Sequence, residues 1–403
     1  MQGNMEDVVK AKNIMVINLG STSYKFKCYR MSEIGSEELL ATGEFENIGS
    51  VASSYRISIG NHAVEENAVF PTHADAFAYA VDYMIKEGIL SSMNELDAVG
   101  YKSVHAGTVS GTKVINDEIL SVMEFFNVLA PAHNPIYIRL MKQLKEAYPG
   151  LIQIGHFETS FHTTIPEKRV VYGVPHAWKE EMGIRRYGFH GSSHEYIAWK
   201  MHEAAPDVKK IISLHLGGSS SVCAIEDGKS IASSMGATPQ TGLFHNNRIG
   251  DFDVFCLPIL MERYGGSLDR VLKVLSSESG LLGLSGVSSD LREVIKAAKE
   301  GNIDAELAIE AFVDNIVGYI GMFSAYLKGL DAIVFTGGIG LKSNIIRKRV
   351  CAELTYSGLC IDDDANEAGV QGKISTKESR IAVYVWETNE ELVVLRKCFH
   401  MLA

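Results

Sequence analysis

The sequence is poor in the features that cross-link, interrupt or anchor a chain. Six cysteines are scattered along 403 residues without a Cys-x-x-Cys pair, and no Cys/His spacing typical of a metal site occurs. Only nine prolines are present and no Pro/Gly/Ser-rich linker is visible, so domain limits must come from changes of pattern. The longest apolar runs, such as 14–17, are short. We therefore expect reduced thiols and no segment near the roughly 20 apolar residues that span a bilayer.

The charge balance excludes another class of protein. Acidic residues outnumber basic ones, 49 against 38, and the net charge is −11. A protein that coats nucleic acid is normally basic, so we expect no nucleic-acid partner. An anionic substrate would need a local site built from particular cations or backbone amides. The first seven residues lack the basic-then-apolar pattern of a signal peptide, which favours the cytoplasm.

Three segments share one pattern, an apolar β-prone run that ends in a Gly-rich turn. They are 14–25, 211–222 and 332–340, and the first two predict hairpins because a second β-prone stretch follows each turn. Glycine lets the backbone approach a phosphate, and Ser/Thr hydroxyls add donors. Lys25 could supply positive charge at the first turn. The alternative is that these are structural turns and that Lys25 is an exposed strand residue.

Stretches outside these segments have apolar residues at helical spacing. This spacing predicts helices over 73–88, 137–147 and 304–328. Strands followed by long helices, twice over, indicate an α/β protein with two related halves.

Two capping signals mark further helices. Ser289 is expected to cap a helix that ends at Lys299. Thr388 and Glu391 have the spacing of a capping box, with Thr388 as N-cap, which predicts a C-terminal helix over 392–401.

Histidines and one arginine stand in Gly-, Pro- or Ser-rich contexts. Arg248 could clamp an oxyanion or could form a salt bridge to Asp251 or Asp253. The histidine spacing supplies no third ligand for zinc, so donation to a charged transition state fits better than a metal site. These histidines are His105, His133, His162, His190 and His194.

Several longer blocks are highly specific when read together and in order. They include Arg-Arg-Tyr-Gly-Phe-His-Gly at 185–191 and Ser-Gly-Val-Ser-Ser-Asp at 285–290, besides 18–25 and 335–340. With them the chain resembles, over nearly its whole length, the acetate kinase family of short-chain acyl kinases. That family belongs to the superfamily of actin, sugar kinases and heat-shock chaperone ATPases.

The resemblance implies a fold, a reaction and an assembly. The fold would be α/β, with two actin-like (ribonuclease H-like) domains flanking a central cleft. The first would comprise 1–162 completed by 387–403, and the second, which binds nucleotide, 163–386. The reaction would be reversible transfer of the ATP γ-phosphate, with Mg²⁺, to acetate or a slightly larger carboxylate, giving an acyl phosphate and ADP. A homodimer is also implied.

The resemblance also assigns site residues. Asn18 and Glu390 would position Mg²⁺, with Glu391 left as the helix cap. The catalytic group would be Glu158, His190, Arg248 and His133. The carboxylate pocket would be formed by Lys102, Val104, Ala132, Phe189 and Pro239. Nucleotide would meet Lys25, Ser21, Ser23, His215, Leu216, Gly217, Gly218, Ser219, Asp290, Leu291, Arg292, Gly338, Ile339, Gly340, Leu341 and Lys342. Phosphoryl transfer needs in-line positioning and charge neutralisation, which cations supply.

Departures from the family pattern fall near the chemistry. The family has an aspartate at Glu158 and an arginine at Lys102, and arginine holds carboxylates with two parallel bonds that lysine cannot make. A family leucine is Ala132, which could admit a longer acyl chain. The turn at 216–221 and the stretch at 338–342 also differ from the family pattern.

These departures leave two alternatives to an ATP-dependent kinase. The altered nucleotide turns could favour pyrophosphate or another donor. The chain could instead be a catalytically weak homologue with a nucleotide-sensing role. Because the cations and the amide of the site are retained, the pattern favours a retuned kinase.

Overall fold

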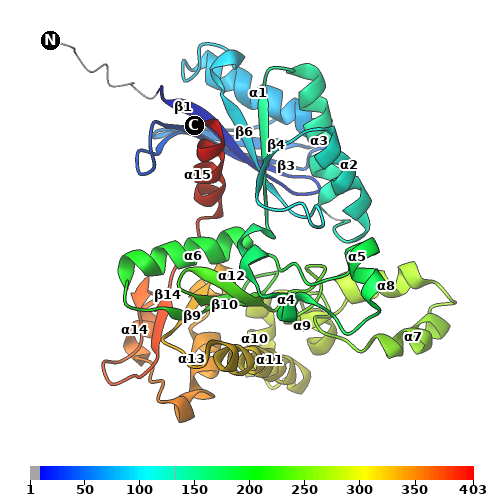
Figure 1. Ribbon diagram of the computed structural model, residues 1–403, viewed down its shortest axis with the longest axis vertical. Coiled ribbons are helices and arrows are strands. Elements are labelled where there is room, and N and C mark those ends of the chain that lie inside the picture. Colours follow the sequence, from blue (N-terminus) through cyan, green and yellow to red (C-terminus); the bar gives the residue numbers. More distant parts are fainter. Residues whose placement is uncertain (1–9, 132) are drawn as a thin grey trace. The chain divides into compact units, whose positions relative to one another are not determined.

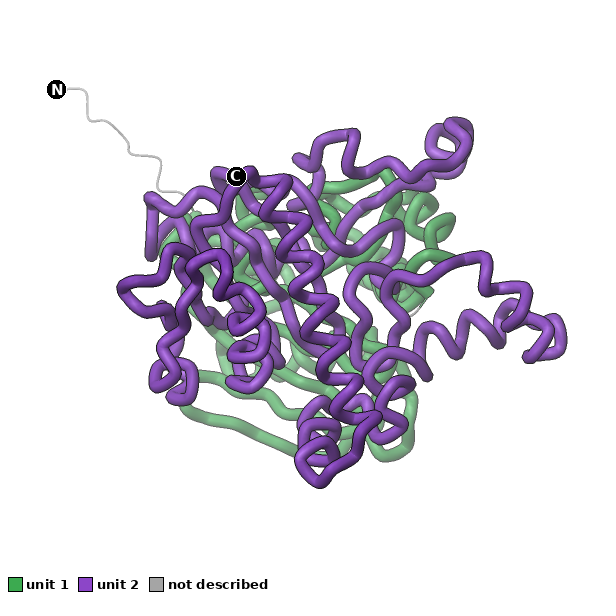
Figure 2. Tube along the Cα trace, turned by 90° about the horizontal axis from the view of Figure 1, so that it is seen from below, with its two compact units in different colours: residues 1–160, 390–403 green, residues 161–389 purple. Residues whose placement is uncertain are grey.

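A computed structural model describes residues 10–131 and 133–403. The chain forms two compact units (Figure 2). The first unit comprises the described residues up to Ser160 together with Glu390–Ala403, and the second is Phe161–Asn389. The C-terminal helix therefore belongs to the same unit as the first strands.

The first unit is built on an eight-stranded mixed sheet, in the order β5-β4-β3-β2-β1-β6-β8-β7. β1, β6 and β8 run parallel, and the remaining neighbours pair antiparallel. The strands are β1 Lys12–Leu19, β2 Tyr24–Met31, β3 Glu38–Glu46, β4 Ser54–Ile59, β5 His62–Asn67, β6 Ala98–Ser103, β7 Thr112–Val114 and β8 Ile152–Phe157.

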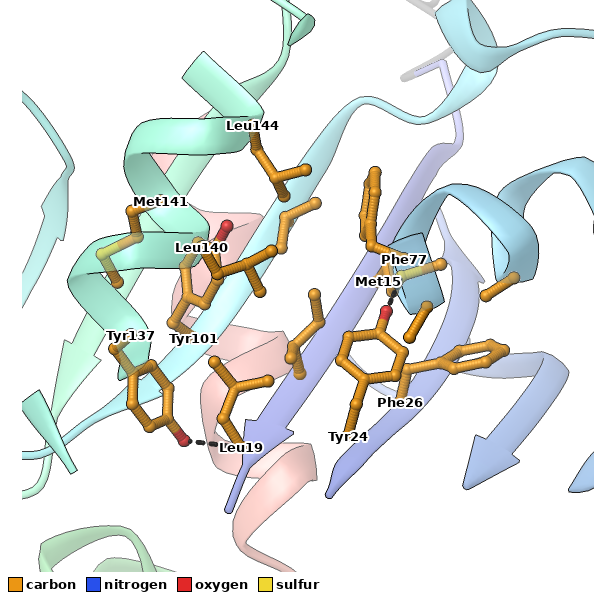
Figure 3. Packing of buried hydrophobic residues seen from close by; sticks show 14 of the residues in the cluster. Met15, Leu19, Tyr24, Phe26, Phe77, Tyr101, Tyr137, Leu140, Met141 and Leu144 are labelled. Carbon is orange, nitrogen blue, oxygen red and sulfur yellow. Dashed lines mark hydrogen bonds between the residues drawn. The ribbon is translucent and has the colours of Figure 1, made fainter. Parts of the chain in front are cut away.

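Helices cover both faces of this sheet. Side chains alternate along β1, so Ile17 packs into the core beneath α1 and α3, whereas Val16 packs against α15. Figure 3 shows the first of these cores, where Tyr137 from α3 and Phe77 from α1 meet the strands. The helices are α1 His73–Lys86, α2 Asp117–Phe125, α3 Asn134–Ala147 and α15 Glu390–Leu402, with short 3-10 turns at Met93–Glu95, Phe126–Val128 and Ser160–Thr164.

The second unit has a six-stranded sheet, in the order β11-β10-β9-β12-β14-β13. β9 and β10 form a hairpin, while β9, β12 and β14 run parallel. Its strands are β9 Lys210–His215, β10 Ser221–Glu226, β11 Lys229–Ser233, β12 Ala332–Thr336, β13 Gly372–Lys373 and β14 Ala382–Val385.

Side chains alternate along the strands of this unit too, so the two faces of its sheet pack into two separate cores. Ile211 of β9 packs with α6, and Ile212 packs into the core that α11 fills. The helices, seen in Figure 1, are α4 Glu167–Val170, α5 His176–Met182, α6 Gly191–Ala204, α7 Leu257–Arg263, α8 Leu268–Ser277, α9 Gly280–Ser285, α10 Leu291–Lys299, α11 Ile303–Leu327, α12 Gly337–Lys342, α13 Asn344–Ala352 and α14 Asp363–Ala368, with 3-10 turns at Val254–Cys256 and Thr355–Ser357.

Both predicted hairpins are confirmed, since β1 pairs with β2 and β9 with β10 in antiparallel register. The helices α1, α3 and α11 also lie where periodicity placed them. Two capping predictions were wrong. Asp290, not Ser289, caps α10, because its carboxylate accepts from the Arg292 N–H. The capping box at Thr388 does not form: α15 begins at Glu390, and the buried Thr388 hydroxyl has no partner among the described residues.

The expectation about apolar length needs a correction as well. By length and composition alone, α11 could cross a membrane. Its Phe312, Ile316 and Phe323 are buried in the core of the second unit. That is the pattern of a core helix.

Candidate active site

Three polar residues stand where neighbouring parallel strands of the first unit end. Asn18 lies near the end of β1, Lys102 near the end of β6, and Glu158 directly after β8. The register places Ile17 beside Tyr101, so Asn18 and Lys102 are level with each other. Ligands of α/β proteins commonly bind at the carboxyl ends of such strands. The topology therefore brings together three of the predicted site residues.

Lys102 is hydrogen-bonded to the C-terminal helix. Its Nζ donates to Glu390 Oε2 at 2.5 Å, and Glu390 is the first residue of α15. Burial alone would lower the pKa of Lys102, but attraction to Glu390 and to the buried Glu158 outweighs it and raises that pKa above its ordinary value. A permanent cation thus lies among the carboxylates of this half of the site.

Asn18 and Lys25 line one pocket of about 370 Å³ on the first sheet, with Lys27 and Arg56. Asn18 Oδ1 accepts a hydrogen bond from the Tyr137 hydroxyl at 3.3 Å. Lys25, predicted to meet phosphate, forms an ion pair with a carboxylate on β3, that of Glu44. Its charge is therefore partly neutralised.

The turn between β1 and β2 carries two of the predicted nucleotide contacts. Ser21 is exposed and Ser23 partly so, and the Gly20 N–H closes the turn on the Ser23 carbonyl at 2.9 Å.

The remaining predictions for the first unit lie around the start of α3. His133 immediately precedes that helix, and Val104 is buried just after β6. His105 is fully buried and accepts from the Gly107 N–H at 2.9 Å, which indicates a structural histidine. Ala132 lies outside the described residues.

Arg248 in the second unit is held by a hydroxyl and a backbone carbonyl, and no acidic partner occurs among the described residues. Its Nη1 donates to Ser219 Oγ at 3.1 Å and to the Pro239 carbonyl at 3.3 Å. Burial lowers the pKa of Arg248, which indicates a partly desolvated guanidinium. The alternative of a salt bridge was wrong in the described part of the chain, because Asp251 bonds Gly242 and Tyr319 and Asp253 caps a 3-10 turn.

His190 occupies the residue before α6 in a left-handed backbone conformation, at φ +55°. That region is uncommon outside glycine and costs free energy, and such residues cluster at functional sites. Its Nδ1 lies 2.8 Å from Ser221 Oγ, and its ring stacks on that of His215 with centroids 4.2 Å apart. The imidazole is therefore fixed by both a hydrogen bond and a ring contact.

Two Gly-rich turns and the start of α10 meet around a pocket of about 480 Å³. Gly337, just before the second predicted stretch, has φ +74°, and a Cβ there would lie 2.6 Å from the Leu216 carbonyl oxygen. Only glycine lets the two turns approach so closely. The predicted nucleotide contacts that line this pocket are Gly217, Gly218, Asp290, Leu291, Arg292, Gly338, Ile339 and Lys342.

Other predicted contacts in the second unit support these turns. The Leu216 carbonyl accepts from the Ile339 and Gly340 N–H groups at 2.8 and 3.1 Å. Leu341 packs into the adjoining core, and Phe189 is buried beside His190.

Sequence reasoning named His194 but missed its hydroxyl partner Ser221, and it missed His245 behind the turn that follows β9. His194 and Ser221 are buried and bonded at 2.8 Å, and His245 Nδ1 accepts from the Ser220 N–H at 2.7 Å. The available signal was a single serine within an otherwise apolar strand, as at Ser213 of β9, where alternation puts the hydroxyl on a buried face.

Comparison with known proteins identifies the family behind this geometry. The acetokinase family pattern matches residues 13–396. The acetate kinase of Geobacillus sp. is 40% identical over 388 residues, covering 95% of this chain and 97% of that protein. The acetate kinase of Bacillus subtilis is 39% identical over 388 residues, covering 95% and 98%. The chain belongs to the acetokinase family.

Solved structures of an acetate kinase and of a propionate kinase agree with the fold. Porphyromonas gingivalis acetate kinase has a TM-score of 0.86 at 35% identity, covering 98% of this chain and all of that one. A propionate kinase from Francisella tularensis has a TM-score of 0.87 at 32% identity, covering 96% and 98%. The predicted actin-like α/β fold class is thereby confirmed.

The residues present suit a magnesium ion that arrives with nucleotide. No group of three or more His, Cys, Asp or Glu able to hold a metal occurs in 10–131 and 133–403. Magnesium commonly uses one or two carboxylates and substrate phosphates. Asn18 Oδ1 and the Glu390 carboxylate have the matching oxygen chemistry.

Proposed function

We propose that this acetokinase transfers the γ-phosphate of ATP reversibly to a short-chain carboxylate through the residues described above. The observation that carries the proposal is the pocket of about 480 Å³ that joins two Gly-rich turns and the N-terminus of α10. Backbone N–H groups there can cradle phosphates, and the apolar side chains of Leu291, Ile295 and Ile339 can cover a base. A pocket of this kind favours a nucleotide over pyrophosphate as donor.

The residues of each unit have distinct parts in the reaction. Arg248 and the Nε2 of His190 stabilise the equatorial oxygens of the transferring phosphoryl group, and Lys102 attracts the acceptor carboxylate. Glu158 and His133 orient the reacting groups. Asn18 and Glu390 would hold a magnesium ion that arrives with the nucleotide, and this ion would neutralise phosphate charge.

The identity of the acid follows from the two departures in the carboxylate pocket. Lys102 is a single point charge and already donates to Glu390, so it orients an acid less tightly than a two-pronged guanidinium would. Ala132, which lies outside the described residues, has a smaller side chain than the leucine of the family pattern. We therefore infer that propionate or butyrate is accepted alongside acetate.

We also infer a homodimer and a cytoplasmic location. The segment around α7 and α8 exposes large apolar side chains, and α8 buries only Val271 in the described part of the chain. Phe255 is 84% and Ile259 71% exposed. Exposed apolar patches of this kind mark interaction surfaces, and a second copy would cover them.

A hydroxamate assay for acyl phosphate tests the proposal. Purified protein with Mg²⁺ would be offered ATP, GTP or pyrophosphate, each with acetate, propionate, butyrate and a branched acid. We expect product with ATP and a short linear acid. Product only with pyrophosphate would contradict the donor, and a folded protein silent with every pair would contradict the reaction.

A further inference from the structure

Behind His190, a chain of buried side chains runs from the helix α6 into the hairpin β9–β10. Ser213 Oγ lies 2.9 Å from His194 Nδ1, His194 Nε2 lies 2.8 Å from Ser221 Oγ, and Ser221 Oγ lies 2.8 Å from His190 Nδ1. Ser213, His194 and Ser221 are each fully buried. All four residues belong to the second unit.

The fold explains why these side chains meet. His190 and His194 are four residues apart at the start of α6, so they share one side of the helix. On the hairpin, Ser213 lies opposite Cys223, and Ser221 lies opposite His215. Because strand side chains alternate, both serines lie on the face that α6 covers.

Hydrogen counting shows that the chain can run in two directions. A neutral imidazole has one N–H, and a hydroxyl donates one hydrogen. In the first direction, Ser213 O–H donates to His194 Nδ1, His194 Nε2–H to Ser221 Oγ, and Ser221 O–H to His190 Nδ1. In the second direction every donor and acceptor is exchanged.

The Ser213 end of this series of hydrogen bonds decides between the two directions. Within the described residues, His194 is the only hydrogen-bond partner of the Ser213 hydroxyl. In the second direction that hydroxyl would accept from His194, and its own hydrogen would be buried without an acceptor. In the first direction every hydrogen of the chain has an acceptor, and a buried unsatisfied donor is avoided. Burial lowers the pKa of His194 well below its ordinary value, in agreement with a neutral ring.

We propose that Ser213, His194 and Ser221 are positioning residues that fix His190 in the tautomer protonated on Nε2. The proposal deepens the proposed function and rests on it for the role of His190 toward phosphate. An imidazole that accepts on Nδ1 from Ser221 keeps its single N–H on Nε2, where it donates to a phosphoryl oxygen. The direction of that donation is thus set at Ser213, two side chains away.

A second contact fixes the backbone that carries His190. His162 Nε2 lies 2.9 Å from the Phe189 carbonyl oxygen, which can only accept, so Nε2 carries the hydrogen. Its Nδ1 then accepts from Ser230 Oγ at 2.9 Å. Burial lowers the pKa of His162 to about 4, so this ring stays neutral at pH 7. The main chain before His190 and the ring of His190 are therefore held by separate groups.

The test reads the tautomer directly, in the full chain labelled with ¹⁵N-histidine. Two-bond ¹H–¹⁵N correlation spectra at pH 8 distinguish Nε2–H from Nδ1–H, and the His190→Gln spectrum identifies the His190 signals. We expect native His190 to be protonated on Nε2. A native ring protonated on Nδ1 would overturn the proposal without any mutation.

Ser213→Ala removes the hydroxyl that sets the direction. Both directions then leave one buried nitrogen unsatisfied, so the ratio of Nδ1–H to Nε2–H forms at His190 should rise on the order of tenfold. Ser213→Thr keeps a hydroxyl and should restore the native ratio. Cys223→Ala, at the residue paired with Ser213, changes the same buried face without touching the chain and should leave the ratio native.

Kinetics separate this proposal from the proposed function. In an active kinase, Ser213→Ala should lower kcat about tenfold with little change in KM, since Ser213 touches no substrate. A tautomer shift in a protein that lacks kinase activity would support the chain and refute the function. An unchanged ratio in both Ser213→Ala and Ser221→Ala would refute the chain whatever the activity.

Discussion

The ammonium of Lys102 donates a 2.5 Å hydrogen bond to Glu390 Oε2 and so joins the end of β6 to the first residue of α15. Glu391, the next residue, lies 3.7 Å from Lys27 on β2. The Glu391 carboxylate, predicted as part of the Thr388 capping box that does not form, faces this lysine. The two glutamates at the start of α15 therefore have different cationic partners: Glu390 bonds Lys102 at the end of β6, whereas Glu391 lines the pocket of Asn18 and Lys25.

Breaking the Lys102–Glu390 pair should destabilise the protein strongly. Both side chains are mostly buried, at 21% and 15% exposed, so Lys102→Met would remove the cation that faces the Glu390 carboxylate and lower the free energy of unfolding by about 3 kcal/mol. In a double-mutant cycle with Glu390→Gln, urea unfolding should give a coupling energy of about 1–3 kcal/mol. The more exposed pair Lys27 and Glu391 is the control and should couple by less than about 1 kcal/mol. Equal coupling for both pairs would contradict a special role for Lys102.

Arg248→Lys should reduce turnover more than binding. Its guanidinium is partly desolvated and fixed on Ser219 and Pro239, and lysine cannot reproduce that geometry. We expect kcat to fall by about 10²–10³-fold while KM for ATP changes little, in steady-state assays. Arg263→Lys, at an exposed position at the end of α7, should be neutral. A raised KM with native kcat would assign Arg248 to ground-state binding.

Gly337→Ala tests the close approach of the two phosphate turns. The added Cβ would meet the Leu216 carbonyl oxygen at 2.6 Å in a left-handed conformation, and we expect a loss of about 1–3 kcal/mol in urea unfolding. The neighbouring Gly338 has open space around its Cβ position and serves as the control. Gly338→Ala should change stability by less than about 1 kcal/mol. Equal losses in the two variants would show that the contact with Leu216 is not limiting.

Acid should destabilise the protein through buried histidines. Burial lowers the pKa of His156 and of His245 to about 3, and that of His162 to about 4. Below the unfolded value of about 6.5 the unfolded chain binds more protons than the folded one. Stability contributed by the neutral rings is therefore complete above about pH 6.5 and is lost as the pH falls toward 3. Between these two pKa values, each histidine lowers the free energy of unfolding by about 1.4 kcal/mol for every unit by which the pH falls.

His245→Asn isolates one of these histidines. Asparagine offers an acceptor for the Ser220 N–H but does not titrate. The slope of unfolding free energy against pH, measured by urea titration between pH 4 and 6, should fall by one proton. His62→Asn, at an exposed position on β5, should keep the native slope. An unchanged slope in His245→Asn would show that this histidine does not couple to folding.

The assembly can be tested by placing charge on the exposed apolar segment. Phe255→Asp combined with Ile259→Asp should convert a dimer to a monomer in light scattering, because burying either carboxylate is costly. Val51→Asp is the control, since Val51 is 91% exposed and lies in the first unit. A native protein that is monomeric at assay concentration would refute the dimer directly.

Local patterns predicted the fold well where one signal dominated. The apolar β-prone run of β1 and the turn at Gly20 were enough to predict the first hairpin, and the helical periodicity predicted α1. The prediction of Ser289 as the N-cap of α10 failed because Ser289 and Asp290 are both good capping residues and are adjacent. Only the backbone conformation decides which of the two side chains faces the first turn of the helix. The assignment of bounds to two domains stays a prediction.

The sequence predicted which residues belong to the site better than it predicted which residues bond to them. The motif order named His190 and Arg248, but the partner of Lys25 depends on the register of β2 against β3, which places Glu44 opposite it. The chain from Ser213 to His190 likewise needs α6 to cross two strands. Contacts between residues so distant in sequence leave no local pattern.

The return of the last helix to the first sheet has a consequence for biosynthesis. Val394 and Cys398 of α15 complete the core over Ile14 and Val16. A ribosome translates the whole second unit before it reaches these residues. One face of β1 thus stays uncovered until the second unit has been made, and a chaperone that shields a nascent apolar surface would remain longest on this face.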